Sequence, residues 1–195
     1  MTKIFVAGST GYIGKNVVKY ALDNGFDVVT AKRHSDNKPG QLNKKLKVIK
    51  ISNNDNNWIA DLEKVDVIIS CLASRTGEPK DAHLVDYKLN CLLLEKAKAL
   101  KCSQFILLSA ICVQKPRLAF QFEKLAFEEE LKKSGLNFSI VRPTAYFKSL
   151  SGQIENIKKG KPYVYFGDGQ ITHCNPISEK DLSLYILSCI KDKTK

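Results

Sequence analysis

Long apolar runs are missing from this chain. No stretch approaches the roughly 20 apolar residues that a membrane-spanning helix needs, and the N-terminus reaches an apolar run too early for a signal peptide. Metal-binding patterns are missing as well, because no two cysteines form a Cys-x-x-Cys pair and the three histidines show no ligand spacing. Several of the six cysteines lie in apolar stretches, which is typical of buried thiols in a reducing compartment. We therefore expect no metal site.

Arginine is also scarce, although the chain is basic. Lysine and arginine together number 31 against 20 acidic residues, so the formal net charge is +11, and the only arginines are Arg33, Arg75, Arg117 and Arg142. Recognition of phosphates and base edges favours clustered arginine, whereas the lysines here are spread along the whole chain. This distribution favours a solvated basic surface, and we expect no nucleic-acid partner. It leaves open a polyanionic small ligand and peripheral association with an anionic membrane surface.

The 195 residues, 44% of them hydrophobic and 26% charged, are typical of one globular domain over residues 1–195. Short β-branched and aromatic runs alternate with helical patterns of apolar residues. We expect strands at 3–7, 27–31, 46–51, 65–70, 105–108 and 138–141, and helices at 12–22, 55–62, 81–100 and 118–133. The alternation predicts an α/β fold with a doubly wound, mostly parallel Rossmann-type sheet and helices on both faces. We expect a surface loop at 34–45 and a small substrate-side segment from about 144 to 195.

A glycine-rich turn follows the first expected strand and opens the first expected helix. Gly8 permits a tight turn, Gly11 lets the backbone approach phosphates, and Gly14 lets the helix pack against the sheet. Free backbone N–H groups and the positive end of the helix then converge on one anion-sized space. The pattern predicts a dinucleotide whose pyrophosphate contacts Gly8, Ser9, Thr10, Gly11, Tyr12, Ile13 and Gly14.

The end of the second expected strand indicates which nicotinamide cofactor is bound. A site that prefers NAD places an acidic residue there, to hold the ribose 2′-hydroxyl. This chain has Lys32 and Arg33 instead, and together with Ser9 they can bind a 2′-phosphate. We therefore expect NADPH as the cofactor. The alternative is that both cations are only solvated, in which case neither cofactor is preferred.

Longer strings carry a family resemblance. The Gly-x-x-Gly-x-x-Gly spacing, Asp86-x-x-x-Asn90 and Val-Arg-Pro-Thr at 141–144 resemble the extended and atypical short-chain dehydrogenase/reductases. Ser-Cys-Leu-Ala-Ser-Arg-Thr-Gly at 70–77 and Leu-Leu-Ser-Ala-Ile-Cys-Val-Gln-Lys-Pro at 107–116 are similar to the divinyl chlorophyllide 8-vinyl reductase family. The resemblance implies NADPH-dependent reduction of the 8-vinyl group of a divinyl chlorophyllide or protochlorophyllide in chlorophyll biosynthesis. Its substrate would be a tetrapyrrole.

Two departures from the family pattern keep a second interpretation open. Members of the family usually continue well past the last residue of this chain, with a segment that helps to enclose the substrate. The superfamily's Tyr-x-x-x-Lys pair is replaced by Phe120-x-x-x-Lys124. The alternative is a non-catalytic NmrA-like NAD(P)-binding protein that acts as a redox sensor or a partner-dependent module. The resemblance places the protein in a bacterial cytoplasm, or in the plastid stroma or at its membrane surface after removal of a transit peptide.

Candidate catalytic residues follow from the same resemblance. A phenyl ring at position 120 has no proton to give. Lys124 can still hold the nicotinamide ribose, and Ser109 stands at the end of the fifth expected strand, near the nicotinamide edge. Reduction of a conjugated vinyl group needs a hydride at one carbon and a proton at the other. Our hypothesis is that the acid is Tyr146, Lys124 or ordered water; core packing is the alternative role for Tyr146.

Further binding candidates follow the fourth and sixth expected strands, because the carboxyl ends of such strands line the ligand crevice. Arg75 can meet a phosphate or the propionate of a tetrapyrrole, unless it only forms a salt bridge within its loop. Phe147 and Phe166 can form an apolar wall for a flat ring, unless they belong to the core. The remaining candidates for cofactor binding are Cys71, Leu72, Ala73, Ser74 and Pro143.

Overall fold

A computed structural model describes residues 2–33, 44–51, 57–164, 168, 170 and 175–191. Its centre is one sheet of six parallel strands in the order β3-β2-β1-β4-β5-β6. The strands are β1 (Lys3–Ala7), β2 (Asp27–Arg33), β3 (Leu46–Ile51), β4 (Val67–Ser70), β5 (Gln104–Leu108) and β6 (Phe138–Val141). The strand order reverses between β1 and β4, where doubly wound sheets bind their ligands. The expected fold class is confirmed.

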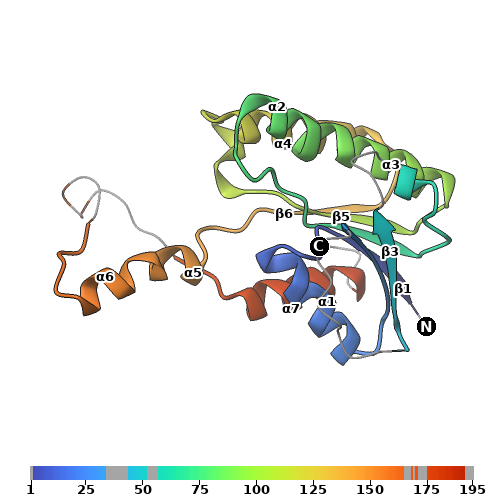
Figure 1. The fold of residues 1–195 in the computed structure, drawn as a ribbon. Coiled ribbons are helices and arrows are strands. Elements are labelled where there is room, and N and C mark those ends of the chain that lie inside the picture. The colour runs from blue at the N-terminus through green and yellow to red at the C-terminus, as the bar shows by residue number, and fades with distance from the viewer. Residues whose placement is uncertain are drawn as a thin grey trace.

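Helices cover both faces of this sheet (Figure 1). They are α1 (Tyr12–Asp23), α2 (Pro79–Ala82), α3 (Leu89–Ala99), α4 (Ala119–Lys133), α5 (Phe147–Leu150), α6 (Ile154–Lys158) and α7 (Glu179–Lys191). α1 and α7 pack together on one face, whereas α3 and α4 cover the other. The short helices α5 and α6 extend away from the sheet in Figure 1. None of the described helices is both long and apolar enough to cross a membrane.

Alternate residues of the central strands fill two cores, one on each face of the sheet. In β1, Phe5 points into the core under α3 and α4, while Ile4 and Val6 point into the core under α1 and α7. All three side chains are fully buried. In β4, Ile68 and Ile69 divide between the two cores in the same way. Strands buried on both faces contain continuous apolar runs, and these runs made the strands recognisable in the sequence.

The prediction of a helix at 55–62 is wrong for residues 57–62, the part of this segment that the structure describes. Only a 3-10 turn, η2 (Asn57–Ile59), is present within residues 57–62. Trp58, Ile59 and Leu62 are nevertheless buried in the core under α3. An irregular segment that buries three apolar side chains shows the same spacing as one turn of a helix, which explains the error.

The helix expected at 81–100 begins earlier and is interrupted. The helical stretch starts at α2, passes through a π-helical turn, η3 (His83–Lys88), and continues as α3. The fourth strand starts at Val67, two residues later than expected, although Val65 is buried beside it. The expected loop at 34–45 lies outside the described residues except for its last two positions.

Candidate functional site

The glycine turn joins the carboxyl end of β1 to the start of α1. Gly8 has a φ of +73°, a conformation that residues with a side chain disfavour. A Cβ atom on Gly8 would lie 2.5 Å from the carbonyl oxygen of Cys71, which follows β4. A Cβ atom on Gly14 would collide with the carbonyl oxygen of Gly8. The close contact that Gly14 permits is therefore between α1 and the turn, rather than between α1 and the sheet as expected.

The start of α1 is open to an anion. Gly11 is the N-cap residue, no side chain caps the first turn, and no acidic residue lies in it. The first N–H groups of a helix have no partner within the helix, and they carry the positive end of its dipole. Thr10 and Gly11 are exposed at this point. The turn thus has the donors and the space that a pyrophosphate requires.

The residues expected to recognise the adenosine ribose stand at the end of β2. Ser9 is buried, and its Oγ lies 2.5 Å from Oγ1 of Thr30 in β2, so its hydroxyl ties the turn to that strand. Lys32 is partly buried, and the backbone of Arg33 ends the strand, paired with Ile51 of β3. The structure therefore brings both basic residues to the carboxyl end of β2, where a ribose-binding residue is expected.

Lys124 is buried between the carboxyl ends of β4 and β5. Its ammonium donates to the carbonyl oxygens of Leu72 at 3.1 Å and Leu108 at 3.5 Å. The same ammonium lies 3.0 Å from a carboxylate oxygen of Asp86, and the two side chains are 7% and 0% exposed. The two carbonyl oxygens accept hydrogen bonds, whereas the Asp86 oxygen forms an ion pair without accepting a hydrogen bond within the described residues. The charge of Lys124 is thereby held in one place at the crevice.

Asp86 belongs to a buried network to which the sequence analysis assigned no role. Its second carboxylate oxygen accepts a hydrogen bond from the backbone N–H of Ser74 at 3.2 Å. Asn90 accepts from the hydroxyl of Ser70 at 2.5 Å and donates to the carbonyl of Asp86 at 3.0 Å. The signal in the sequence was the Asp86-x-x-x-Asn90 spacing, because residues i and i+4 share one face of a helix. The π-helical turn η3, which holds Asp86, is of a kind frequent at functional sites.

Ser109 follows β5 and is a buried polar residue. It is 4% exposed, and its hydroxyl oxygen has no hydrogen-bond partner within the described part of the chain. Its backbone N–H is used, since it donates to the carbonyl of Val141 in β6 at 2.8 Å. Buried hydroxyl groups normally have a partner. An unpartnered one beside a ligand crevice indicates a group that a ligand would satisfy.

Tyr146 faces the same region from the segment after β6. Burial, and to a smaller extent the neighbouring Cys71, raises the pKa of Tyr146 to about 12. Burial also raises the pKa of the Cys71 thiol to about 12, against the opposing influence of Lys124. Cys71 therefore interacts with both Lys124 and Tyr146, and the thiol and the phenol keep their protons at neutral pH.

Tyr12 links the start of α1 to the C-terminal part of the chain. Its hydroxyl donates to the carboxylate of Glu179, in α7, at 2.6 Å. This hydrogen bond raises the pKa of Tyr12 and lowers the pKa of Glu179. The Tyr12 ring also meets the Tyr146 ring edge-on, with centroids 6.0 Å apart, and the ammonium of Lys148 lies 4.5 Å from its centroid. The turn, α5 and α7 are thus connected through one side chain.

The substrate-binding candidates are not gathered in one place. Arg75 is exposed beside Asp81, whose carboxylate accepts a hydrogen bond from the Arg75 backbone N–H at 2.9 Å. Phe147 is 55% exposed at the start of α5, so it is not a core residue. Phe166 lies outside the described residues.

Pro143, a candidate for cofactor binding, is buried, and its carbonyl accepts a hydrogen bond from the N–H of Ile111 at 3.1 Å.

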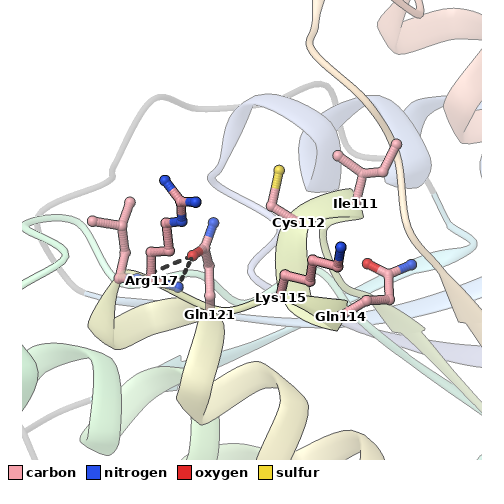
Figure 2. Close-up of a pocket in the computed structure, with 7 residues that line it drawn as sticks. Ile111, Cys112, Gln114, Lys115, Arg117 and Gln121 are labelled. Carbon is pink, nitrogen blue, oxygen red and sulfur yellow. Dashed lines mark hydrogen bonds between the residues drawn. The ribbon is translucent and has the colours of Figure 1, made fainter.

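A cavity that no sequence pattern had indicated opens just after β5. It has a volume of about 720 Å³ and is formed by the 3-10 turn η4 (Ile111–Gln114) and the start of α4 (Figure 2). The string of residues at 107–116 had served only to recognise a family. Nothing local in that string shows that it folds into a hollow.

Among the described residues, no group of three or more histidine, cysteine or acidic side chains could hold a metal ion.

Comparison with known proteins identifies the family. Residues 8–193 match a family model described as NAD(P)H-binding. The chain belongs to this NAD(P)H-binding family. The match begins at Gly8, the first residue of the glycine turn, and it supports a nicotinamide dinucleotide as the cofactor.

Two plant relatives of this NAD(P)H-binding chain are named as chloroplastic divinyl chlorophyllide a 8-vinyl-reductases. The protein of Cucumis sativus is 46% identical over 100% of this chain and 51% of its own length. The protein of Arabidopsis thaliana is 45% identical over 98% of this chain and 51% of its own length. The chain thus spans about half the length of these curated relatives.

A solved structure shows the same fold at much lower sequence identity. The UDP-glucose 4-epimerase of Thermotoga maritima, solved with UDP-glucose, superposes with a TM-score of 0.81 at 19% identity. The superposition covers 97% of this chain and 74% of the epimerase. It supports the Rossmann-type arrangement of the NAD(P)H-binding chain and nothing narrower.

Proposed function

We propose that this chain reduces the 8-vinyl group of a divinyl chlorophyllide or divinyl protochlorophyllide to an ethyl group, with NADPH as the cofactor. The observation that carries the proposal is the identity of 46% and 45% to two reductases of that name over nearly the whole chain. The buried, unpartnered hydroxyl of Ser109 supports it, because this group stands at the crevice where the reaction would occur.

The residues of the site fit the proposed cofactor. The glycine turn and the open start of α1 suit a pyrophosphate. Lys32 and Arg33 stand at the end of β2, and cations at this place favour the 2′-phosphate of NADPH over the free hydroxyl of NADH. Leu72, Lys124 and Ser109, at the ends of β4 and β5, would hold the nicotinamide half.

Bound NADPH supplies a hydride, so the protein has to provide a proton for the second carbon of the vinyl group. Phe120 has no acidic proton, and the ammonium of Lys124 is paired with Asp86 and donates to the carbonyls of Leu72 and Leu108. Tyr146 keeps its phenolic proton at neutral pH because its pKa is about 12. In our proposal Tyr146 is therefore the proton donor, and Lys124 holds the ribose and a fixed positive charge. A weak acid is sufficient, because the macrocycle delocalises the charge that develops.

Turnover of divinyl protochlorophyllide with NADPH, followed by chromatographic separation of vinyl and ethyl pigments, tests the proposal. Tyr146→Phe removes only the hydroxyl and should lower kcat by roughly 100-fold, at the lower end of what general acids contribute. The matched control is Tyr163→Phe, because Tyr163 is 53% exposed in the same segment and its variant should keep the wild-type rate. Full activity of the Tyr146→Phe variant would assign the proton to water instead.

Phe120 favours a second candidate function, that of a non-catalytic NAD(P)-binding protein. It replaces the tyrosine that the superfamily uses as its acid. Saturation with NADPH at 100 times the dissociation constant should stabilise the chain by about 2.7 kcal/mol in either case. Such binding without reduction of any tetrapyrrole would support the second function, whereas hydride transfer to one would exclude it.

A further inference from the structure

The cavity after β5 has the size and the lining of a site for a small molecule. Its volume of about 720 Å³ lies within the usual range of roughly 300–1,000 Å³ for ligand pockets. It begins two residues beyond Ser109 and extends to the first turns of α4, the helix that carries Lys124. Its lining residues are Ile111, Cys112, Gln114, Lys115, Arg117, Leu118 and Gln121.

Apolar side chains and cations are combined in this cavity. Ile111 is 45% exposed and Leu118 is 56% exposed, and both side chains line the same cavity. Figure 2 shows Arg117 beside Gln121 on one side, and Lys115 and Ile111 on the other. The side-chain oxygen of Gln121 accepts hydrogen bonds from the backbone N–H groups of Arg117, at 2.8 Å, and Leu118, at 3.0 Å. These bonds fix the backbone of residues 117 and 118, so the Arg117 side chain extends from a fixed position at the cavity.

Within the described residues the two cations of the cavity have no anionic partner, in contrast to Arg142. Arg142 pairs with the buried carboxylate of Glu128 through two nitrogens. Within the described part of the chain, the side chains of Lys115 and Arg117 form no ion pair and no hydrogen bond. Both are exposed, and both belong to the lining of the same cavity.

We propose that this cavity binds the propionate edge of the tetrapyrrole, with Lys115 and Arg117 holding the free carboxylate and Ile111 and Leu118 contacting the ring. The inference rests on the function proposed above. Arginine binds carboxylates with paired N–H donors, and a flat macrocycle covers exposed aliphatic groups. The assignment replaces Arg75, the sequence-based candidate for the propionate, because Arg75 is not among the residues that line this cavity.

A comparison of divinyl protochlorophyllide with its propionate methyl ester isolates the carboxylate. For the wild-type chain we expect the acid to have the lower KM and the lower dissociation constant, the latter measured by the change in pigment fluorescence. Arg117→Gln and Lys115→Gln should each reduce the preference for the acid by roughly threefold to tenfold. Arg117→Lys, which keeps the charge, should restore part of the preference. The matched control is Lys64→Gln, because Lys64 is exposed ahead of β4, at the amino ends of the strands and therefore at the opposite end of the sheet.

The outcomes separate this inference from the proposed function. If the wild-type chain turns over the pigment and prefers the acid, but Arg117→Gln keeps that preference, the carboxylate site is wrong and the proposed function stands. The same conclusion follows if Arg75→Gln abolishes the preference instead. If the wild-type chain binds the acid more tightly than the ester, Arg117→Gln removes this difference and no variant turns over the pigment, the site is supported and the proposed function is overturned. Equal binding of acid and ester by the wild-type chain also overturns the site.

Discussion

Removal of the Asp86 carboxylate charge should destabilise this protein far more than the loss of a surface ion pair. Asp86→Asn keeps the size of the side chain and an acceptor for the Ser74 N–H, but it leaves the Lys124 ammonium, 7% exposed, without its counter-charge. Removing one partner of a buried pair typically costs about 3–5 kcal/mol, because the other charge stays buried and uncompensated. The carbonyls of Leu72 and Leu108 still accept from Lys124, so we expect about 2–4 kcal/mol.

Urea unfolding followed by circular dichroism measures this loss, provided that the slope of the transition is unchanged. The matched control is Glu129→Gln, which breaks the exposed pair of Glu129 with Lys132 and should cost at most about 1 kcal/mol. Lys124→Met completes a double-mutant cycle with Asp86→Asn, and the coupling energy should exceed about 1 kcal/mol. If Asp86→Asn lowers the free energy of unfolding no more than Glu129→Gln does, the reasoning from burial is refuted.

Three further predictions concern the glycine turn and its surroundings. Gly14→Ala forces a methyl group against the Gly8 carbonyl and should cost about 1–3 kcal/mol in urea unfolding; Gly152→Ala, with open space around it, is its control. Arg33→Ala should raise the dissociation constant for NADPH by about tenfold and leave that for NADH unchanged; equal effects on both would contradict the 2′-phosphate assignment. Tyr12→Phe removes the hydrogen bond that lowers the pKa of Glu179, so its stability deficit should be present at neutral pH and disappear as the pH falls below about 4. A deficit that is constant between pH 7 and pH 3 would exclude Glu179 as its cause.

Local chemistry made most of the fold predictable. The central strands β1, β4 and β5 are short apolar runs that end at a turn, and the glycine turn needs only its own residues to be recognised. The segment at 57–62 shows the limit of this reasoning, since Trp58, Ile59 and Leu62 are buried at helical spacing without forming an α-helix. Spacing shows which side chains are buried, but the neighbours that bury them decide the backbone conformation.

The site was predictable only in part, because its decisive contacts join distant parts of the chain. Lys124 was selected from a family motif, but its partner Asp86 comes from a different helix and is visible only after folding. The cavity likewise needs the turn η4 and the start of α4 to be placed side by side. Arg117 looks like any other surface arginine in the sequence. What distinguishes it is its place in the lining of the cavity and, within the described residues, the absence of an ion pair such as that of Arg142.

Phe120 connects the cavity with the proposed chemistry. It lies on α4 between the cavity residue Leu118 and the buried Lys124. A tyrosine there would place a phenol next to the reacting atoms and would suit the reduction of a carbonyl, whose oxygen takes up a proton. A phenyl ring offers an apolar surface instead, and the charge of Lys124 is engaged by Asp86. This arrangement disfavours alcohol and ketone chemistry and suits hydride transfer to a carbon–carbon double bond in a flat conjugated ring, where a weak, more distant acid such as Tyr146 is sufficient.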